Sequence, residues 1–166
     1  MLSQINSIKL RTMRKEDYSL TLAWRSNNEI YEGFYQQSLA HKGLVWEDHV
    51  KWNESRNADW RRFIVIYDNR PVGVVTMSDL DHWCPEVGLY IGEVSLWGKG
   101  IGTKMLQKAL EWIKEYSLSH AYIVGCRTTI LNANIAAVKV FIKCGFKRTA
   151  DARKGESWYQ CMFGES

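Results

Sequence analysis

Apolar and polar residues alternate with a period of two in several short stretches of the chain. Residues 8–11, Ile-Lys-Leu-Arg, show the alternation that is typical of a half-buried strand. Residues 63–67 form an apolar, β-branched run that stops at the turn signal Asp-Asn-Arg-Pro of residues 68–71. Residues 72–77 resume the strand pattern, so the two runs predict a β-hairpin.

Other segments repeat apolar residues with the period of an α-helix. Residues 15–27 and 46–56 each carry such a stripe, and a longer amphipathic helix is predicted from the glycines at 98–102 to about residue 116. Residues 134–143 predict a further helix that stops at Gly145, because glycine commonly ends helices. The apolar face predicted for the long helix consists of Met105, Leu106, Ala109, Leu110 and Ile113.

Apolar runs also predict strands at residues 86–91, 121–126 and 157–163. The predicted order is strand, two helices, three strands, helix, strand, helix, strand. A strand–helix–strand crossover joins parallel strands, so the unit over residues 86–126 predicts at least one parallel pair. The sequence therefore predicts an α/β fold with a mixed central sheet flanked by helices. Because no repeat or Pro/Ser-rich linker interrupts the pattern, we expect residues 1–166 to form a single domain.

Composition narrows the class of protein. With 166 residues, 46% of them apolar, the chain is long enough for a real core, and 24% charged residues with two prolines argue against disorder. The four cysteines form no C-x-x-C pair or zinc-ligand spacing, so we expect no metal, and Cys126, Cys144 and Cys161 are interpreted as buried free thiols. There is no signal-peptide run and no apolar stretch of about 18 residues. We therefore expect a cytoplasmic protein without a membrane partner.

The net charge of +4 is unevenly distributed. Residues 1–100 carry 12 Lys+Arg against 13 Asp+Glu, a difference of −1, whereas residues 101–166 carry 10 against 5, a difference of +5. A basic C-terminal part suits a polyanionic ligand such as a phosphorylated cofactor, although a solvated basic face explains it as well. No run of Lys and Arg indicates a nucleic-acid partner. Eight tryptophans are more than a core alone usually needs, so we expect some of them to line a pocket or an interface, and a homodimer is one such possibility.

The most specific local feature is the glycine-rich segment Leu-Trp-Gly-Lys-Gly-Ile-Gly-Thr at residues 96–103, between a predicted strand and the long helix. Glycines at alternate positions leave backbone N–H groups uncovered, and the helix start adds positive dipole charge, which together suit a pyrophosphate. The Rossmann and Walker spacings are both absent. A glycine-rich turn without a ligand is the alternative interpretation.

A second segment, residues 134–146, is by itself a helix capped by Asn134 and stopped by a glycine. Together, however, the two segments resemble the GNAT superfamily of acetyl-CoA-dependent N-acetyltransferases. The loop resembles that family's [QR]-x-x-G-x-[GA] motif, with Trp97 where Gln or Arg is commonest, and W-G-K-G is familiar from the branch that acetylates ribosomal-protein N-termini. The second segment is similar to the family pattern N-x-x-[AS]-x-x-x-[YF]-x-K-x-G-F, with matches at Asn134, Ala137, Phe141, Lys143, Gly145 and Phe146.

The resemblance implies the GNAT fold, in which two parallel strands splay apart and the pantetheine arm lies between them. Here the two strands would be residues 86–91 and 121–126. Backbone groups near residues 91–94 would pair with the pantetheine amides, and residues 99–103 would hold the pyrophosphate. The residues expected to bind acetyl-CoA as cosubstrate are Ile91, Val94, Gly98, Lys99, Gly100, Ile101, Gly102, Thr103, Asn134, Phe141 and Lys143.

One departure from the family pattern concerns the general acid. The family often has tyrosine at the position of Phe141, where it is thought to protonate the departing thiolate, and phenylalanine has no proton to give. By residue type alone, the substitutes are Tyr90, Tyr122, Tyr159 and Cys144. For the base that deprotonates the amine, Glu86 is the first candidate because it begins the strand that faces the thioester in this family. A surface charge at the end of a strand is the alternative role for Glu86.

The N-terminal half is expected to form the acceptor site. Its segments Trp-Arg-Ser at 24–26 and His-Val-Lys-Trp at 49–52 are similar to a W-R-N…H-x-x-W pattern of GNAT enzymes that acetylate nucleotide-linked amino sugars. The predicted acceptor is thus a primary amine of a small molecule, with an amino-sugar nucleotide as the first guess. N-terminal acetylation of a protein and an inactive acyl-CoA-binding module remain as alternatives.

The residues expected to contact the acceptor are Trp24, Arg25, His49, Trp52 and His82. Packing in the core would explain the tryptophans equally well, and a single histidine on a helix more often packs than binds. The acidic residues that would attract a cationic amine are Glu29, Glu32, Asp79 and Asp81.

Overall fold

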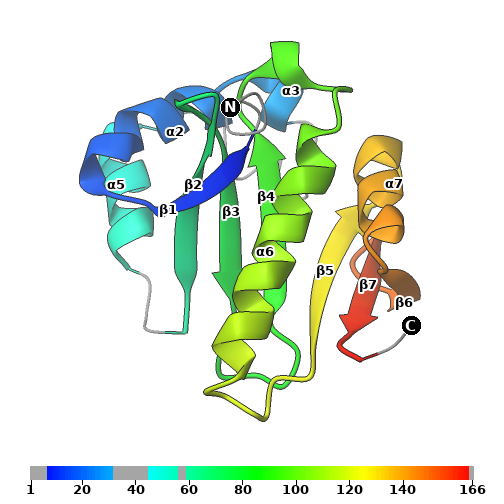
Figure 1. The fold of residues 1–166 in the computed structure, drawn as a ribbon. Coiled ribbons are helices and arrows are strands. Elements are labelled where there is room, and N and C mark those ends of the chain that lie inside the picture. Colours follow the sequence, from blue (N-terminus) through cyan, green and yellow to red (C-terminus); the bar gives the residue numbers. More distant parts are fainter. Residues whose placement is uncertain (1–6, 32–44, 56–58, 165–166) are drawn as a thin grey trace.

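The computed structural model describes residues 7–31, 45–55 and 59–164, which form one seven-stranded sheet with helices on both faces (Figure 1). The strand order across the sheet is β1-β2-β3-β4-β5-β7-β6. The strands are β1 (Ile8–Thr12), β2 (Arg61–Tyr67), β3 (Arg70–Ser78), β4 (Glu86–Ile91), β5 (Gly125–Leu131), β6 (Lys147–Asp151) and β7 (Glu156–Met162).

The helices divide between the two faces of the sheet. Those on one face precede β2 in the chain, and α6 and α7 lie on the other (Figure 1). The helices are α2 (Tyr18–Arg25), α3 (Asn28–Tyr31), α5 (Trp46–Glu54), α6 (Ile101–Ser117) and α7 (Ile135–Lys143), with short 3-10 turns η1 (Lys15–Asp17) and η2 (Val94–Leu96).

The predicted hairpin is confirmed as β2 and β3, which pair in antiparallel fashion. Its two turn residues, Asp68 and Asn69, both have positive φ, at 51° and 60°. Two such residues match the right-handed twist of the strands they join, and Asp and Asn tolerate this conformation better than most other residues.

The pairing of β4 with β5 is parallel, as the crossover through α6 requires, and all other neighbouring pairs are antiparallel. Only Glu86 and Arg127 are in register between β4 and β5, so the two strands diverge from that point towards their C-terminal ends. The predicted mixed α/β sheet with splayed parallel strands is therefore confirmed.

The core has two parts, one on each face of the sheet. The larger part packs α6 and α7 on the sheet, and all five residues predicted for the apolar face of α6 are buried in it. The smaller part joins Trp24 and Ile30 to Ile64 and Val74 on the opposite face.

Two predictions of secondary structure were wrong in part, and one strand was not predicted. The strand expected at 121–126 runs instead over Gly125–Leu131, and residues 121–122 form a turn in which the Tyr122 hydroxyl donates to the Leu80 carbonyl (2.7 Å). The helix expected at 15–27 is divided into η1 and α2. Strand β6 was not expected at all, because each of its residues is exposed and no apolar pattern marks it.

The thiols also differ from the expectation. All four cysteines are free, but Cys144 and Cys161 are only half-buried, whereas Cys84, for which burial was not predicted, lies in the core with Cys126. Neighbouring Gln160 donates to the Cys84 sulfur at 3.5 Å.

Candidate active site

Alternate side chains of β4 point to opposite faces of the sheet, one face toward the core and the other toward the candidate active site. Val87, Leu89 and Ile91 pack in the core beneath α6, and Glu86, Gly88 and Tyr90 therefore point to the face on which α2 lies. Gly88 is exposed, and no atom of the described residues lies within 4 Å of where a Cβ atom would be. An exposed glycine thus lies between a carboxyl and a phenol on this face of the strand.

Glu86 is half-buried at the point where β4 and β5 are joined. Burial raises the pKa of its carboxyl, and Asp79 raises it further, against the opposite effect of Arg127 and Arg153. Within the described residues the Glu86 side chain has no hydrogen bond or ion pair. A partly desolvated carboxylate of this kind is suited to accept a proton.

Tyr90 lies two positions beyond Gly88 on the same face, with its ring edge-on to Trp24 at a centroid distance of 6.3 Å. Burial raises the pKa of its hydroxyl, although Arg62 and Arg25 nearby lower it. The hydroxyl is therefore protonated at neutral pH and can donate a proton or a hydrogen bond.

The glycine-rich loop has a backbone that requires its glycines. Gly98 and Gly100 have φ of 75° and 80°, the left-handed region that favours glycine. Both are exposed, and a Cβ atom at either would meet no atom within 4 Å in the part of the chain that the structure describes. The loop is therefore open to solvent and able to approach a ligand closely.

Helix α6 begins directly after Gly100, and no side chain caps its N-terminus. The first backbone N–H groups of an α-helix have no partner inside the helix, and α6 is long, at about 25 Å, so its dipole is well developed. Free donors and an open loop of this kind are what a pyrophosphate group requires. Binding of a pyrophosphate by Lys99, Ile101, Gly102 and Thr103 stays a prediction from the sequence.

Trp97 connects the glycine-rich loop to the end of β4, and this contact was not predicted from the sequence. Its indole Nε1–H donates to the carbonyl of Ile91 at 3.2 Å. Val94, the other residue of this edge expected to meet pantetheine, packs against the smaller core. The end of β4 and the glycine-rich loop thus form one connected structure.

Helix α7 lies against the first turn of α6. Asn134 caps it, accepting a hydrogen bond from the Ala137 N–H at 3.2 Å, which was the simpler of its two expected roles. At the other end, the Cys144 thiol donates to the Thr103 carbonyl at 3.9 Å, while Lys143 is exposed. The ring of Phe141 is 4% exposed and packs edge-on to Phe146, at a centroid distance of 4.9 Å. The position usually held by tyrosine therefore contributes to the core here.

Two of the residues expected to contact the acceptor are buried in the structure. Trp24 is 5% exposed, covers the backbone of Gly92 and donates to Glu93 Oε1 at 3.3 Å. His49 is 1% exposed, and its Nε2 lies 2.9 Å from Thr21 Oγ1. Both thus have the packing role that the sequence left open.

Arg25 and Trp52, by contrast, are half-buried and belong to a cationic cluster. The guanidinium carbons of Arg25 and Arg62 lie 4.5 and 4.4 Å from the centroid of the Trp52 ring, and that of Arg62 lies 5.1 Å from Trp60. Arg62 also donates to Asn53 Oδ1. Burial, followed by these two arginines, lowers the pKa of His49 to about 4. The sequence reasoning missed Arg62, although a charge at the start of an apolar strand was a usable signal.

The loop between β3 and β4 carries His82 and Asp79. His82 Nδ1 accepts a hydrogen bond from the Cys84 N–H at 3.0 Å, and its ring stacks on Trp83. Asp79 forms an ion pair with Arg127 at 3.1 Å, and Arg127 was also missed by the sequence reasoning. Asp81 and Glu29 are exposed, and Glu32 lies outside the described residues.

Two of the proposed substitutes for the general acid lie elsewhere. Tyr122 is in the turn after the C-terminal end of α6, whereas the glycine-rich loop is at its N-terminal end. Tyr159 is buried in the core beneath α6 and α7. Of the substitutes, only Tyr90 shares a face of the sheet with Glu86.

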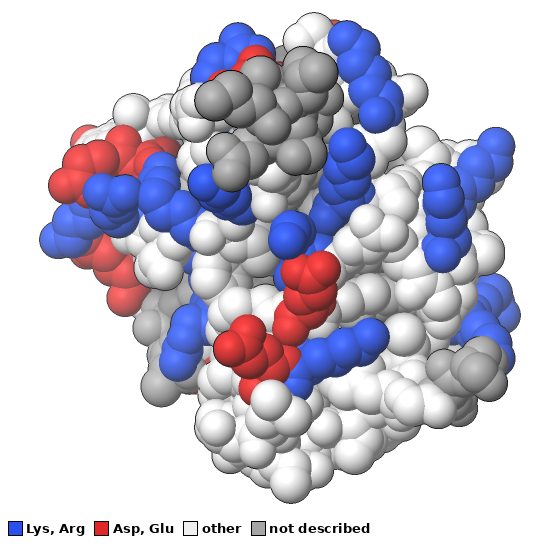
Figure 2. All heavy atoms as spheres, in the orientation of Figure 1, with Lys and Arg blue, Asp and Glu red and all other residues white. Residues whose placement is uncertain are grey.

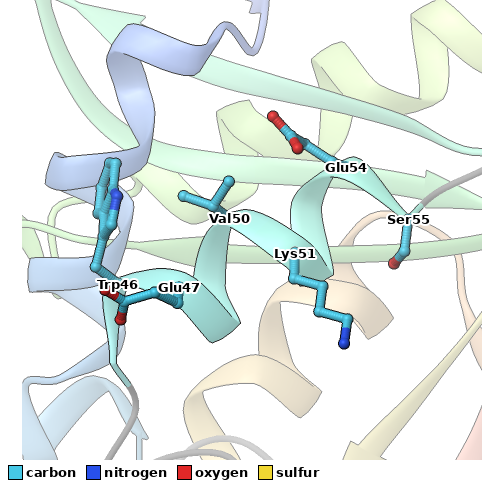
Figure 3. A pocket seen from close by; sticks show the side chains of 6 residues that line it. All are labelled: Trp46, Glu47, Val50, Lys51, Glu54 and Ser55. Atoms are coloured by element: carbon cyan, nitrogen blue, oxygen red, sulfur yellow. The ribbon is translucent and has the colours of Figure 1, made fainter.

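A hollow on the surface of α5 contains none of the predicted site residues (Figure 3). It is lined by Trp46, Glu47, Val50, Lys51, Glu54 and Ser55. In the described part of the chain, no group of three or more His, Cys, Asp or Glu residues could hold a metal ion. Nor does any described helix have the length and apolar character needed to cross a membrane.

Charge is unevenly spread over the face seen in Figure 2. Lys and Arg predominate on the right, over α7 and β6, whereas Asp and Glu are seen on the left, with Lys and Arg among them, and at the centre of the view. The exposed basic residues of α7 and β6 are Lys139, Lys143, Lys147 and Arg148, and the exposed acidic residues of α5 are Glu47, Asp48 and Glu54. The basic region therefore belongs to the half of the molecule that includes the helix next to the glycine-rich loop.

Comparison with known proteins identifies the family and the fold of the chain. Residues 7–147 match the family model of the acetyltransferase (GNAT) domain. The uncharacterized protein MJ1062 of Methanocaldococcus jannaschii is 38% identical over 162 residues, which are 93% of this chain but 31% of that protein, so the chain spans about a third of its length.

Several solved structures are similar over almost the whole chain. A domain from M. jannaschii superposes with a TM-score of 0.85 at 34% identity, covering 95% of this chain and 99% of that one. Spermidine N-acetyltransferase from Vibrio cholerae, in complex with CoA and spermine, superposes with a TM-score of 0.79 at 16% identity, covering 94% and 95%. The second likeness is one of fold.

Proposed function

This chain belongs to the GNAT family of acetyltransferases, and on that premise we propose that it acetylates a primary amine on a small anionic molecule. Acetyl-CoA is the donor, and an amino-sugar nucleotide is the first candidate for the acceptor. The amine nitrogen attacks the thioester carbonyl, the carbon–sulfur bond breaks, and the products are an N-acetyl amide and free CoA thiol.

In this proposal the residues of β4 handle the protons. An amine is mostly protonated near neutral pH and must lose a proton to attack, which the half-buried Glu86 carboxylate accepts directly or through water. The departing thiolate takes a proton from solvent or from Tyr90, since Phe141 has none to give. The open Gly88 between them leaves room for the acceptor.

Donor binding falls to the loop and helix start at residues 98–103, with backbone groups at Ile91 and Val94 facing the pantetheine arm. The open glycines and the uncapped start of α6 support this assignment. Asn134 and Lys143 on α7 would approach the same ligand, because α7 packs on the first turn of α6.

The observation that carries the choice of acceptor is the positive charge beside Tyr90. Arg25 and Arg62 both lie over Trp52, and both act on the pKa of Tyr90 and of His49. Cations at this place repel a polyamine such as the spermine bound to the Vibrio enzyme. The half-buried Arg25 can meet a phosphate group, for which guanidinium is the best-matched side chain, whereas the buried Arg62, which donates to Asn53, adds positive charge from beneath. The Trp52 ring suits a sugar or base.

The proposal is tested by release of CoA thiol from acetyl-CoA in the presence of a panel of amines. The panel contains amino-sugar nucleotides, the same amino sugars without the nucleotide, spermidine and short peptides. We expect turnover with the nucleotide-linked sugars and little with spermidine. Preference for spermidine or for peptides contradicts the proposed acceptor class.

Two variants separate donor binding from chemistry. Gly100→Trp places a large side chain at a left-handed position of the donor loop, so acetyl-CoA binding and turnover should both be lost. Glu86→Gln should retain acetyl-CoA binding but lose about 100-fold or more of kcat. Acetyl-CoA binding without transfer to any amine would favour an inactive acyl-CoA-binding module.

A further inference from the structure

The ion pair between Asp79 and Arg127 lies next to the Glu86 carboxyl. Ser78, Glu86 and Arg127 occupy neighbouring positions across β3, β4 and β5, and Asp79 directly follows Ser78. The bond from Arg127 Nη2 to Asp79 Oδ2 (3.1 Å) therefore extends across β4 at Glu86. The Arg127 guanidinium also lies 5.0 Å from the centroid of the Trp158 ring, which supports it from the β7 side.

The other charges that act on Glu86 are also paired. Arg153, in the loop between β6 and β7, bonds Glu156 at 3.0 Å. Two cations and two other carboxylates thus surround Glu86, and the cations are matched to those carboxylates rather than to Glu86. Glu86 is the one carboxylate of the three that has no ion pair within the described part of the chain.

We propose that Asp79 is a positioning residue that holds the Arg127 guanidinium away from Glu86 and so keeps Glu86 available as a base. The proposal rests on the function proposed above. A carboxylate that forms an ion pair with arginine is a weak base, because the proton it would accept has to displace a favourable interaction. By occupying Arg127, Asp79 prevents that loss.

The charges predict opposite effects for the two partners. Asp79→Asn removes a negative charge and releases Arg127 towards Glu86, so the pKa of Glu86 should fall. Asn tolerates the left-handed backbone of Asp79 (φ 56°), which makes the substitution conservative. Arg127→Gln removes the cation and leaves Asp79 near Glu86, so the pKa of Glu86 should rise. In the double variant neither charge remains, and the pKa should return towards that of the unaltered protein.

The test is a titration of the Glu86 side-chain carboxyl by carbon-13 NMR in the four proteins, accompanied by pH profiles of kcat/KM. In Asp79→Asn the acid limb of the profile should move to lower pH, with the plateau about tenfold lower, since the base is weaker. In Arg127→Gln the limb should move to higher pH. Glu111→Gln, which removes an exposed pair on α6 far along the chain, should leave both readouts unchanged.

A purely structural pair would give a different result. Both single variants would then lose thermal stability and activity while the Glu86 titration stayed in place, or moved in the same direction, and either outcome overturns the proposal. The NMR titration does not depend on turnover. Absence of acetyl transfer by the unaltered protein would therefore contradict the proposed function alone, and the NMR result would remain a separate test of the positioning role.

Discussion

At the scale of single residues, Gly92 allows α2 to approach the end of β4. A Cβ atom at this position would lie 2.1 Å from the Trp24 ring, so the indole lies directly on the backbone of the glycine. The Trp24 Nε1–H then reaches Glu93. This contact fixes the backbone that follows β4, which leads into the donor loop.

We therefore expect Gly92→Ala to lower the free energy of unfolding by about 1–3 kcal/mol, because the added methyl overpacks the Trp24 contact. Gly88→Ala is the matched control on the same strand, since its Cβ meets nothing, and it should leave stability unchanged or slightly higher. Urea unfolding of the three proteins measures both effects. Equal stability of the two variants would show that the Trp24 contact is not rigid.

His49 is a second residue whose role is fixed by its surroundings. Its pKa is lowered to about 4, first by burial and then by Arg25 and Arg62, so the folded protein holds the neutral ring. Below the ordinary histidine pKa of about 6.5, the unfolded chain binds a proton that the folded protein does not. Stability supplied by the neutral ring is therefore complete above that pH and is lost as the pH falls towards 4.

The predicted loss between pH 6.5 and pH 4 is about 3 kcal/mol for this group. It is measured as the difference in unfolding free energy between the unaltered protein and His49→Gln, at neutral and at acidic pH. The unaltered protein should be the more stable one at neutral pH, and its advantage should shrink on acidification. A difference that is independent of pH contradicts a buried, neutral His49.

Only some of the roles of residues at the candidate site could be predicted from the sequence alone. The glycines at 98 and 100 were predicted as an open loop, because their spacing needs only backbone geometry to be interpreted. Trp24 and His49 were ambiguous, because a tryptophan or histidine on a helix has the same spacing whether it packs or binds. Arg127 and Asp79 were not related by sequence, since 48 residues separate them and only the register of β3, β4 and β5 brings them together.

At the scale of elements, β4 links the core to the proposed acceptor site, because one of its faces packs in the core and the other faces that site. Its bounds were predicted correctly from a short apolar run. Strand β5 was placed too early, because Ala-Tyr-Ile-Val at 121–124 is the more apolar run, whereas the true strand alternates buried residues with Arg127 and Thr129. Strand β6 carries no apolar signal, since all of its residues are exposed and it is held to β7 by backbone pairing and by side-chain hydrogen bonds from Arg148 and Thr149.

The open face of β4 leads to a prediction about Gly88→Val. Valine is well suited to a strand, and its branched side chain would occupy the space over Gly88 between Glu86 and Tyr90. We expect kcat/KM for the acceptor to fall about tenfold or more, while the Kd for acetyl-CoA, bound at the end of the strand, stays unchanged. Thr149→Val on the exposed strand β6 is the control and should change neither constant. Equal loss of donor binding would mean that the space over Gly88 belongs to the donor site.

At the scale of the whole molecule, charge separates the two ends of the sheet. The acidic residues of α5 and the basic residues of α7 and β6 lie on opposite sides of the face in Figure 2. A pyrophosphate at the start of α6 lies on the side of the basic helix, and the arginines over Trp52 add positive charge near Tyr90. Both ligands proposed for this protein are anionic. The donor would bind on the basic side, whereas the acceptor would meet Arg25 and Arg62 over Trp52, which belongs to the helix with the exposed acidic residues.

Long-range attraction of this kind is sensitive to salt, because the Debye length shortens from about 10 Å at 0.1 M to about 3 Å at 1 M ionic strength. With acetyl-CoA saturating, kcat/KM for an amino-sugar nucleotide should fall several-fold when NaCl is raised from about 0.05 to about 0.5 M. The same amino sugar without its nucleotide should respond little, and Arg25→Gln should flatten the dependence for the nucleotide. A rate that rises with salt for the nucleotide-linked sugar, or a stronger dependence for spermidine, would mean that the field at the acceptor site is negative. In that case the acidic residues outside the cationic cluster, rather than Arg25 and Arg62, would govern the choice of acceptor.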